Sequence, residues 1–578
     1  PSKDWDKKIA VNGGKLTPAQ KQWWDFKRNN FDCVLFFKVG KFYELFHMDA
    51  DVGVKELSVG ANPMIFMAGA QGHSGFPEIS YGKFANILVE KGYRVMRIEQ
   101  TERPDALAEW NKGKSAGQKR HVVRRSICAV LTPGTRTNGT MDGPWAQYAA
   151  QSILLAISER PLTAVEVEES GGTSACEYGV FFGDSQTSSF RVGQFVDDKQ
   201  RNRLRTLLSS IRPREVVFPK AAEGTLGGLS EATHSILKAE SHTGMVMTGL
   251  NVSGQAWGID KTLAELKKQF DIIHQHEKED EVQAPFNVRQ KQTSGDPLWR
   301  WPGILHDLAV VEGTKVVPAG RCELAIHSIG NALQHMQRCL VDTQILEKGT
   351  FYPYVPVDMQ ESDNGIVALS RNSSQQDSNA ATSDLADMVA NGGDANKLMV
   401  LDSHCLRNLE IHENSHDKSI KGSLLEFLDH TMTPYGRRLF QSWVMSPLYN
   451  ISKINARLDA VEVLMDAQES VCTARNSLRG IKYDLERLLS SVHTLGSRYL
   501  SRDHPMAEAI MYEEDKYLQY KTRDFGFLLK GLNAVSELIK DIAAELKNHG
   551  GDRSKLLLSI LPIASAGNAD NTSGAYLE

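Results

Sequence analysis

The hydrophobic pattern of this 578-residue chain changes character near residue 305. Before that point, short runs rich in aromatic and β-branched residues alternate with helical segments, a pattern typical of α/β sheet domains. After it, apolar residues recur at spacings of three and four, which is the period of amphipathic helices. A chain of this length is too long for one hydrophobic core. We therefore expect a multidomain fold with α/β modules first and an all-α part after them.

The first α/β module is expected over residues 15–140. Its start carries a capping box, in which Thr17 and Gln20 satisfy the first free backbone groups of a helix. The next run, FDCVLFFKVGKFYELF, predicts strand with a bend or bulge at Gly40. The run SYGKFANILVEKGYRVMRIEQ then predicts a helix that stops at Gly92 and a strand after it, and SICAVLTPGT predicts another strand.

A second α/β module is expected over residues 145–305, where strand and helix patterns alternate again. The polar and acidic stretch HQHEKEDEVQAP, which starts at His274, is expected to be an excursion from this module. Residues 306–578 are expected to form a helical domain with a flexible insertion at 370–397, because the composition there is that of a flexible segment. The apolar stripes expected to pack in the helical core are Ile454, Leu458, Val461 and Met465; Leu485, Leu488, Leu489, Val492 and Leu495; and Leu528, Leu532, Val535, Ile539, Ile542 and Leu546.

Charge is distributed unevenly along the chain. The formal net charge of the whole chain is −5, whereas residues 15–135 hold 18 Lys and Arg against 12 Asp and Glu. A basic module on an acidic body points to nucleic acid or another anionic surface as partner. The loop NKGKSAGQKRHVVRR, residues 111–125, is either a solvated loop or a loop that contacts phosphates. Its candidate DNA-backbone contacts are Lys112, Lys114, Lys119, Arg120, Arg124 and Arg125.

Three aromatic residues and a carboxylate share the stretch KFYELF. On an extended strand Phe42 and Glu44 point to one face and Tyr43 to the other. In one interpretation Phe42 is a core residue and Glu44 is solvated, but a core face should not carry an unpaired carboxylate. In the other, both face a ligand: the phenyl ring wedges between base steps and the carboxylate hydrogen-bonds a base edge. Such a pair would sense a base that is poorly stacked and poorly paired.

Other classes of function have weaker support. No uninterrupted apolar run reaches the ~18 residues of a membrane-spanning helix, so no membrane is expected as a partner. The seven cysteines are scattered without a CxxC pair, which fits a reducing compartment. Asp184 follows a predicted strand, which makes an RNase H-like nuclease an alternative function. The further carboxylates that would hold the metal ions of such a nuclease are not evident in the sequence. We predict no catalytic residue and no metal site. A scaffold that binds phosphates without preferring mismatches is a second alternative.

Several segments resemble the MutS family of DNA mismatch-repair proteins. The first is VGKFYELFHMDADVGVKEL, whose Phe-x-Glu hallmark falls on Phe42 and Glu44, and the second is HSGFPEISYGKFANILVEKGYRVMRIEQTERP. The resemblance resumes at YGVFFGDSQTSSFRVGQFVDD, LDSHCLRNLEIHEN and GSLLEFLDHTMTPYGRRLFQSWVMSPLYNISKINARLDAVEVLM. These segments run in family order from about residue 18 to at least residue 547. Lys41 and the HMDA sequence favour the eukaryotic subunits that read mismatches in the MutS-alpha heterodimer.

The resemblance implies a fold and a reading site. The fold is a mixed α/β mismatch-binding domain, a connector with an RNase H-like sheet, and a helical core with long lever helices. Phe42 would stack on a mispaired or small looped-out base in kinked duplex DNA, and Glu44 would hydrogen-bond that base. Lys41, Val39 and Met67 would lie beside them at the lesion. The resemblance also gives Asp184 no catalytic role, since the family's connector is not a nuclease.

The resemblance further implies partners and a missing part. The partners are mismatched double-stranded DNA, MutS homologue 2 in a heterodimer, and downstream MutL-type proteins, and the location is the nucleus. The family's ATPase domain is expected to be absent from these residues, and the clamp domain is at most begun at the C-terminal end. The fragment is therefore expected to be no enzyme and to need no cofactor. The full-length parent would be a DNA-dependent ATPase that uses ATP/ADP and Mg²⁺.

Overall fold

The computed structural model describes most of the chain. The described residues are 17–57, 65–67, 72–137, 151–169, 172–221, 227–240, 245–252, 256–281, 298, 301–313, 315–359, 398–417, 419–548 and 553–561. The predicted insertion at 370–397 and the predicted beginning of a clamp at the C-terminal end lie outside them. The chain divides into two compact units: unit 1 is Pro1–Lys199, Ile211–Tyr354 and Ser490–Thr522, and unit 2 is Gln200–Ser210, Val355–Leu489 and Arg523–Glu578.

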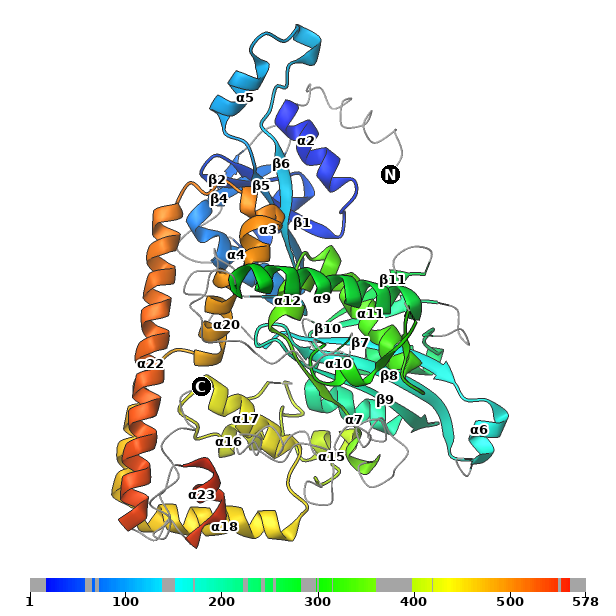
Figure 1. Ribbon diagram of the computed structural model, residues 1–578, viewed down its shortest axis with the longest axis vertical. Helices are drawn as coiled ribbons and strands as arrows, with labels where there is room; N and C mark the ends of the chain where they lie inside the picture. Colours follow the sequence, from blue (N-terminus) through cyan, green and yellow to red (C-terminus); the bar gives the residue numbers. More distant parts are fainter. Residues whose placement is uncertain are drawn as a thin grey trace. The chain divides into compact units, whose positions relative to one another are not determined.

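Within the described part of unit 1, the first sheet has six strands in the order β3-β4-β2-β1-β5-β6 (Figure 1). The strands are β1 (Cys33–Val39), β2 (Phe42–Phe46), β3 (Ile65–Met67), β4 (His73–Pro77), β5 (Arg94–Gln100) and β6 (Arg125–Leu131). The helices are α2 (Pro18–Lys27), α3 (Met48–Leu57), α4 (Tyr81–Glu90) and α5 (Pro104–Asn111). The expected helix start at Thr17, the strands around Gly40 and the helix-strand pair around Gly92 are confirmed.

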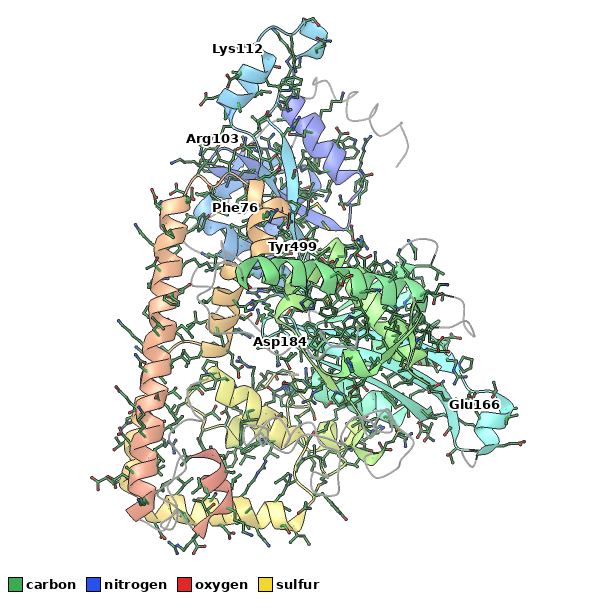
Figure 2. The ribbon with its side chains drawn as sticks, in the orientation of Figure 1. Phe76, Arg103, Lys112, Glu166, Asp184 and Tyr499 are labelled. Atoms are coloured by element: carbon green, nitrogen blue, oxygen red, sulfur yellow. The ribbon has the colours of Figure 1, made fainter. Side chains whose placement is uncertain are left out.

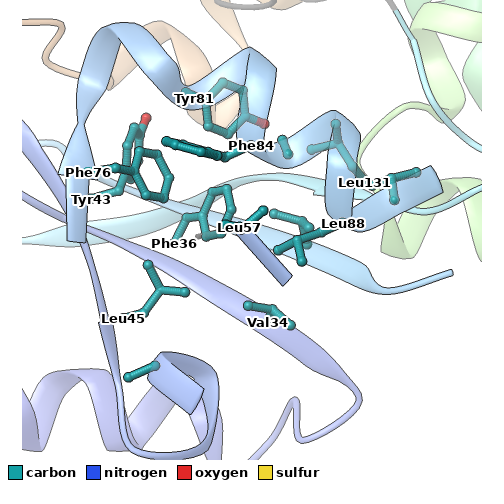
Figure 3. Packing of buried hydrophobic residues seen from close by; sticks show 14 of the residues in the cluster. Val34, Phe36, Tyr43, Leu45, Leu57, Phe76, Tyr81, Phe84, Leu88 and Leu131 are labelled. Carbon is teal, nitrogen blue, oxygen red and sulfur yellow. The ribbon is translucent and has the colours of Figure 1, made fainter. Parts of the chain in front are cut away.

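An aromatic core lies between this sheet and α4 (Figure 3). The rings of Phe36 and Phe76 meet edge to face with centroids 4.8 Å apart, and Tyr43 and Tyr81 pack beside them with centroids 5.5 Å apart. All four side chains are buried. Aromatic pairs of this kind contribute about 0.5–1.5 kcal/mol each beyond their area burial. The sheet is therefore a firm base for the turns that it presents.

The second sheet of unit 1 has the strand order β11-β10-β7-β8-β9-β14. Its strands are β7 (Ile153–Pro161), β8 (Ser174–Asp184), β9 (Ser189–Asp198), β10 (Glu215–Lys220), β11 (Val246–Asn251) and β14 (Thr350–Pro353). The other elements of this part of the chain are α6 (Ala164–Glu169), α7 (Asn202–Ile211), α8 (Glu231–Ala239), α9 (Ile259–Glu281), α10 (Ile304–Asp307), β12 (Ala309–Glu312), β13 (Lys315–Pro318), α11 (Glu323–Arg338) and α12 (Asp342–Lys348). α11 lies so close to β8 that a methyl group on Gly179 would come within 2.1 Å of the Leu324 carbonyl oxygen.

The structure ends this second α/β module later than the predicted boundary at residue 305. β14 pairs in parallel with β9, and the joint register sets Phe351 against Phe190. Local periodicity could not reveal this pairing, because it joins segments about 160 residues apart. The expected excursion at His274 is also corrected in part, since α9 continues to Glu281. The remaining residues of that stretch lie outside the described ones.

The described chain after residue 403 is predominantly helical, which confirms the all-α part of the fold. Its helices are α15 (Ser403–Asn408), α16 (Leu424–Leu428), α17 (Pro434–Met445), α18 (Ile451–Asp466), α19 (Gln468–Gly480), α20 (Leu485–Gly496), α21 (Arg498–Arg502), α22 (Glu514–Asn548) and α23 (Lys555–Ile560). α22 is one continuous helix of 35 residues (Figure 1). In the described part of the chain, no helix has both the length and the apolarity needed to cross a membrane.

The predicted apolar stripes are only partly buried. On α18 the buried residues are Ala460 and Val463, which pack with Leu546 of α22 and Leu557 of α23. The predicted core residues of the same helix are exposed instead, namely Ile454, Leu458, Val461 and Met465. In the other stripes Leu485, Leu488, Leu528 and Leu546 are buried, whereas Leu489, Leu495 and Leu532 are exposed. A helical period shows that a face is apolar, but it does not show which neighbour covers that face.

Candidate nucleic-acid interface

The β1–β2 hairpin carries four of the five residues for which the sequence predicts base reading, and the fifth, Met67, lies on β3. Its last strand pair is Val39 with Phe42, so Gly40 and Lys41 make a two-residue turn. Gly40 has a φ of +56°, which tight hairpin turns require and which glycine adopts without penalty. The amide of Glu78 donates to the carbonyl of Lys41 at 2.9 Å, which ties the turn to the chain that follows β4.

Side chains alternate along β2 as the period of a strand predicts. Phe42 is 50% exposed, whereas Tyr43 and Leu45 are fully buried, and Glu44 is half-buried. The aromatic side chains at the neighbouring positions of the sheet, Phe37 among them, are buried. The hairpin therefore exposes one phenyl ring beside its turn and one carboxylate on the same face.

Glu44 has a basic neighbour on the adjacent strand. Nε2 of His73 lies 3.4 Å from Oε2 of Glu44, and the His73 ring stacks on Phe46 with centroids 4.9 Å apart. Arg125 also interacts electrostatically with this carboxylate. Burial lowers the pKa of Arg125 to about 10, and the negative charge of Glu44 acts against that shift. The carboxylate thus lies near an imidazole and a guanidinium group of the protein, while about a quarter of its side chain stays exposed.

The other predicted reading residues lie at different distances along the sheet. Lys41 is exposed, and its Nζ lies 3.6 Å from Oε1 of Glu513. Val39 is half-buried opposite Phe42. The backbone of Met67 pairs with His73, which in turn pairs with Phe46. The register therefore sets Met67 level with Phe46, at the end of β2 away from Phe42, and sequence reasoning did not reveal this separation.

A buried ionic cluster underlies the hairpin. Nζ of Lys38 lies 2.9 Å from Oε2 of Glu78 and 3.8 Å from Oε2 of Glu99, and all three side chains are almost completely inaccessible. The hydroxyl of Tyr43 donates to Glu99. Burial lowers the pKa of Lys38, while the two carboxylates act against that shift. The sequence analysis missed this cluster, although a lysine inside the apolar run CVLFFKV was a signal that it needed a buried partner.

Five of the six predicted DNA-backbone contacts lie on a projecting arm, which consists of α5 and residues 112–124 (Figure 2), whereas Arg125 is the first residue of β6. Lys112, Lys119 and Arg124 are exposed on it. Lys114 and Arg120 lie against the Trp110 ring. Nζ of Lys114 lies 2.8 Å from the ring centroid, and Cζ of Arg120 lies 4.0 Å from it.

Arg120 and Arg125 also bind other protein groups. Arg120 forms an ion pair with Glu102 at 2.6 Å. Arg125 donates to Gln22 Oε1 at 2.7 Å and to the carbonyl of Lys38 at 2.8 Å. The structure therefore separates three freely presented basic side chains from three that have partners within the protein.

Asp184 ends β8 and is buried, and its Oδ1 accepts a hydrogen bond from the amide of Gln186 at 2.9 Å. Among the described residues, no group of three or more His, Cys, Asp and Glu side chains is arranged to hold a metal ion. A metal-dependent nuclease needs such a group of carboxylates. The nuclease interpretation therefore has no ligand set in the part of the chain that the structure describes.

Comparison with known proteins identifies the class. Residues 17–140 match MutS domain I and residues 404–570 match MutS domain III, together about half of the chain. These matches contain the β1–β2 hairpin and the long helix α22. The chain belongs to the MutS family, which confirms the resemblance seen in the sequence.

Particular relatives carry the comparison further. The chain is 35% identical over 540 residues to a protein of Gallus gallus named DNA mismatch repair protein Msh6, covering 92% of this chain and 36% of that protein. The Homo sapiens protein of the same name is 35% identical over 553 residues, covering 95% and 36%. An archaeal DNA mismatch repair protein MutS, from Methanosarcina acetivorans, is 26% identical over 481 residues, covering 82% and 41%. The chain spans about a third of the length of the Msh6 proteins it matches.

Proposed function

We propose that this chain recognises mispaired or small looped-out bases in duplex DNA as part of post-replicative mismatch repair. The observation that carries the proposal is the 50% exposure of Phe42, next to the turn of a hairpin whose neighbouring aromatic side chains are buried. The names of the relatives, which are mismatch-repair proteins, support the same function.

Phe42 acts as the probe in this proposal. An apolar ring that enters a base step from the minor groove unstacks the step and kinks the duplex. Unstacking costs least where a base is already mispaired, so the insertion favours a lesion over intact duplex. The packed aromatic core beneath the hairpin supports this role, because only a rigidly held ring can kink the duplex.

Glu44 adds the polar contact. Its carboxylate accepts a hydrogen bond from the edge of the displaced base, and its partial exposure leaves it accessible for that contact. The same negative charge repels DNA phosphates, and so weakens binding to intact duplex, where no displaced base forms the compensating hydrogen bond. Lys41 lies beside the probe, while Val39 supports the turn from β1. Met67 belongs to the lesion contacts only if DNA extends along the sheet to the level of Phe46.

Basic side chains supply affinity that does not depend on sequence. Lys112, Lys119 and Arg124 on the arm are the best placed for phosphates, because they are exposed. Lys114, Arg120 and Arg125 contribute less directly, since they also contact protein groups. Contacts of this kind weaken steeply with salt.

The wider activity belongs to the full-length parent. We propose that the parent is a nuclear, DNA-dependent ATPase that uses ATP/ADP and Mg²⁺, pairs with MutS homologue 2 and acts upstream of MutL-type proteins. No described residue of this chain is assigned to nucleotide binding, and no step of base reading runs through the nucleotide.

Duplex binding at one fixed, moderate salt concentration tests the proposal. The full-length parent and its partner subunit are titrated with a G·T duplex and with its matched control, for wild type, Phe42→Ala and Phe31→Ala. Phe31 is the control because it is also an exposed phenylalanine of the same domain, 46% exposed, but lies outside the hairpin. We expect the mismatch preference to vanish only in Phe42→Ala. Equal binding of both duplexes by wild type would instead favour the scaffold without mismatch preference.

A further inference from the structure

Residues 510–517, which lead into α22 and form its first turn, pack against the β1–β2 hairpin of the mismatch-reading sheet. They lie within the stretch matched to MutS domain III, almost 400 residues after the one matched to MutS domain I. Residues 510–517 and the stretch matched to MutS domain I nevertheless both belong to unit 1. The amide of Ile510 donates to the carbonyl of Gln100 at 2.8 Å, which attaches the segment to the end of β5. Tyr517 is buried among the aromatic core residues of the reading sheet.

Gln100 connects this segment to the hairpin turn. Its Oε1 accepts one hydrogen bond from the amide of Gly40 at 3.1 Å and another from the hydroxyl of Tyr512 at 3.2 Å. Gly40 is the first residue of the turn and lies two residues before Phe42. One amide oxygen therefore joins the turn to a tyrosine that is distant in sequence.

Two further contacts join this segment to the hairpin. Oε2 of Glu78 accepts from the amide of Tyr512 at 3.1 Å and also faces Nζ of Lys38 on β1 at 2.9 Å. Oε1 of Glu513 lies 3.6 Å from Nζ of Lys41. The hairpin is thus held both through its buried face and at its exposed turn.

We infer that Tyr512 is a positioning residue for mismatch reading, which fixes the turn of the β1–β2 hairpin through Gln100 and so sets where Phe42 meets DNA. This inference rests on the proposed function. A wedge works only if its ring enters the base step at one position, so the contacts that fix the turn before Phe42 decide where the ring lies. In this inference Tyr512 acts on the turn through Gln100, whose Oε1 accepts from its hydroxyl, and not through a contact with DNA.

The test compares two tyrosine-to-phenylalanine variants of the full-length parent with its partner subunit. Tyr512→Phe removes only the hydroxyl that reaches Gln100. Tyr93→Phe is the matched control, because the Tyr93 hydroxyl donates to Oε1 of Glu56 at 3.2 Å in the same domain. Tyr93 precedes β5 whereas Gln100 ends it, so the two sites lie roughly 20 Å apart along the strand. Affinities for the G·T duplex and the matched duplex are measured for each variant at one salt concentration.

We expect Tyr512→Phe to lower the mismatch preference about two- to tenfold, as the loss of one hydrogen bond would, mainly through weaker binding of the G·T duplex. Matched-duplex affinity and melting temperature should stay those of Tyr93→Phe. Gln100→Met should reproduce the loss, and the double variant should add little to it, since both changes break one network.

Three outcomes would overturn the inference. An unchanged preference in Tyr512→Phe, beside a lost preference in Phe42→Ala, removes the positioning role and leaves the proposed function intact. An equal loss of affinity for both duplexes shows a merely structural role. Absence of any preference in wild type overturns the proposed function and this inference with it.

Discussion

Nε2 of His73 lies 3.4 Å from Oε2 of Glu44, across the neighbouring strands β4 and β2. The His73 ring is itself held by stacking on Phe46, so the imidazole is a fixed neighbour of the carboxylate. About a quarter of the Glu44 side chain is exposed, and this fixed neighbour limits the positions that its carboxylate can take. The pair therefore orients Glu44 on the face of the sheet that we propose meets DNA.

Removing the charge of Glu44 should increase binding to intact DNA. Glu44→Gln keeps the size of the side chain but ends its repulsion of phosphates, so matched-duplex affinity should rise about two- to fivefold. The mismatch preference should fall, since the matched duplex gains and the base contact weakens. Binding curves for both duplexes over a range of salt concentrations measure this.

The control for this prediction is Asp51→Asn, which removes an exposed carboxylate from α3 of the same domain. If Asp51→Asn and Glu44→Gln raise matched-duplex affinity equally, the effect comes from net charge and does not depend on the position of Glu44.

The buried cluster under the hairpin should be costly to break. Lys38→Met leaves Glu78 and Glu99 as buried carboxylates without their ammonium partner, and we expect it to lower the free energy of unfolding by about 3–5 kcal/mol. Adding Glu78→Gln to Lys38→Met should recover part of the loss, because one uncompensated charge is removed. Urea unfolding of wild type and these two variants measures this, with the exposed Lys55→Met as control. A double variant less stable than Lys38→Met alone would contradict the account.

A second buried pair makes stability depend on pH. Nε2 of His335 on α11 lies 3.2 Å from Oε1 of Glu215 on β10. Burial alone would raise the pKa of Glu215, but His335 and hydrogen bonds from Thr132 and Thr248 lower it to about 2. Burial alone would lower the pKa of His335, but Glu215 and Cys339 raise it to about 10. Arg94 also faces Glu215, with its NH2 group 3.7 Å from Oε1.

The stability from His335 should be complete below its ordinary pKa of 6.5 and should be lost as pH rises toward 10. That from Glu215 should be complete above 4.5 and lost as pH falls toward 2. Urea unfolding at pH 6, 7.5 and 9 should therefore show declining stability for wild type. His335→Gln should be less stable at pH 6, on the order of 3 kcal/mol, and less dependent on pH. The exposed His121→Gln is the control, and an identical pH profile in His335→Gln would refute the pairing.

Truncations at two positions of α18 should differ in stability cost in the opposite order to the one that the apolar periodicity predicts. Leu458 is 60% exposed, so Leu458→Ala should change the free energy of unfolding of this chain by no more than about 0.5 kcal/mol. Val463 is 2% exposed, so Val463→Ala should cost about 1–2 kcal/mol. Urea unfolding of both variants measures the difference, and a larger cost at Leu458 would restore the predicted core stripe.

Much of the local structure follows from neighbouring residues. The capping box at Thr17, the stop at Gly92 and the opposite facing of Phe42 and Tyr43 all depend on contacts within a few residues, and all are found. The buried state of Lys38 does not follow in this way, because Glu78 and Glu99 reach it from other strands.

By itself the sequence determined the membership of the MutS family, the order of α/β and helical parts, and the face of β2 that carries Phe42 and Glu44. These depend on local propensity and the strand period, which are set by residues close together in the sequence. Only the tertiary structure decided that Tyr512 supports the turn at Gly40, that β14 completes a sheet begun at β7, and which apolar residues of α18 are covered. The physical reason is that such contacts join residues far apart in sequence, whose meeting depends on how whole elements pack.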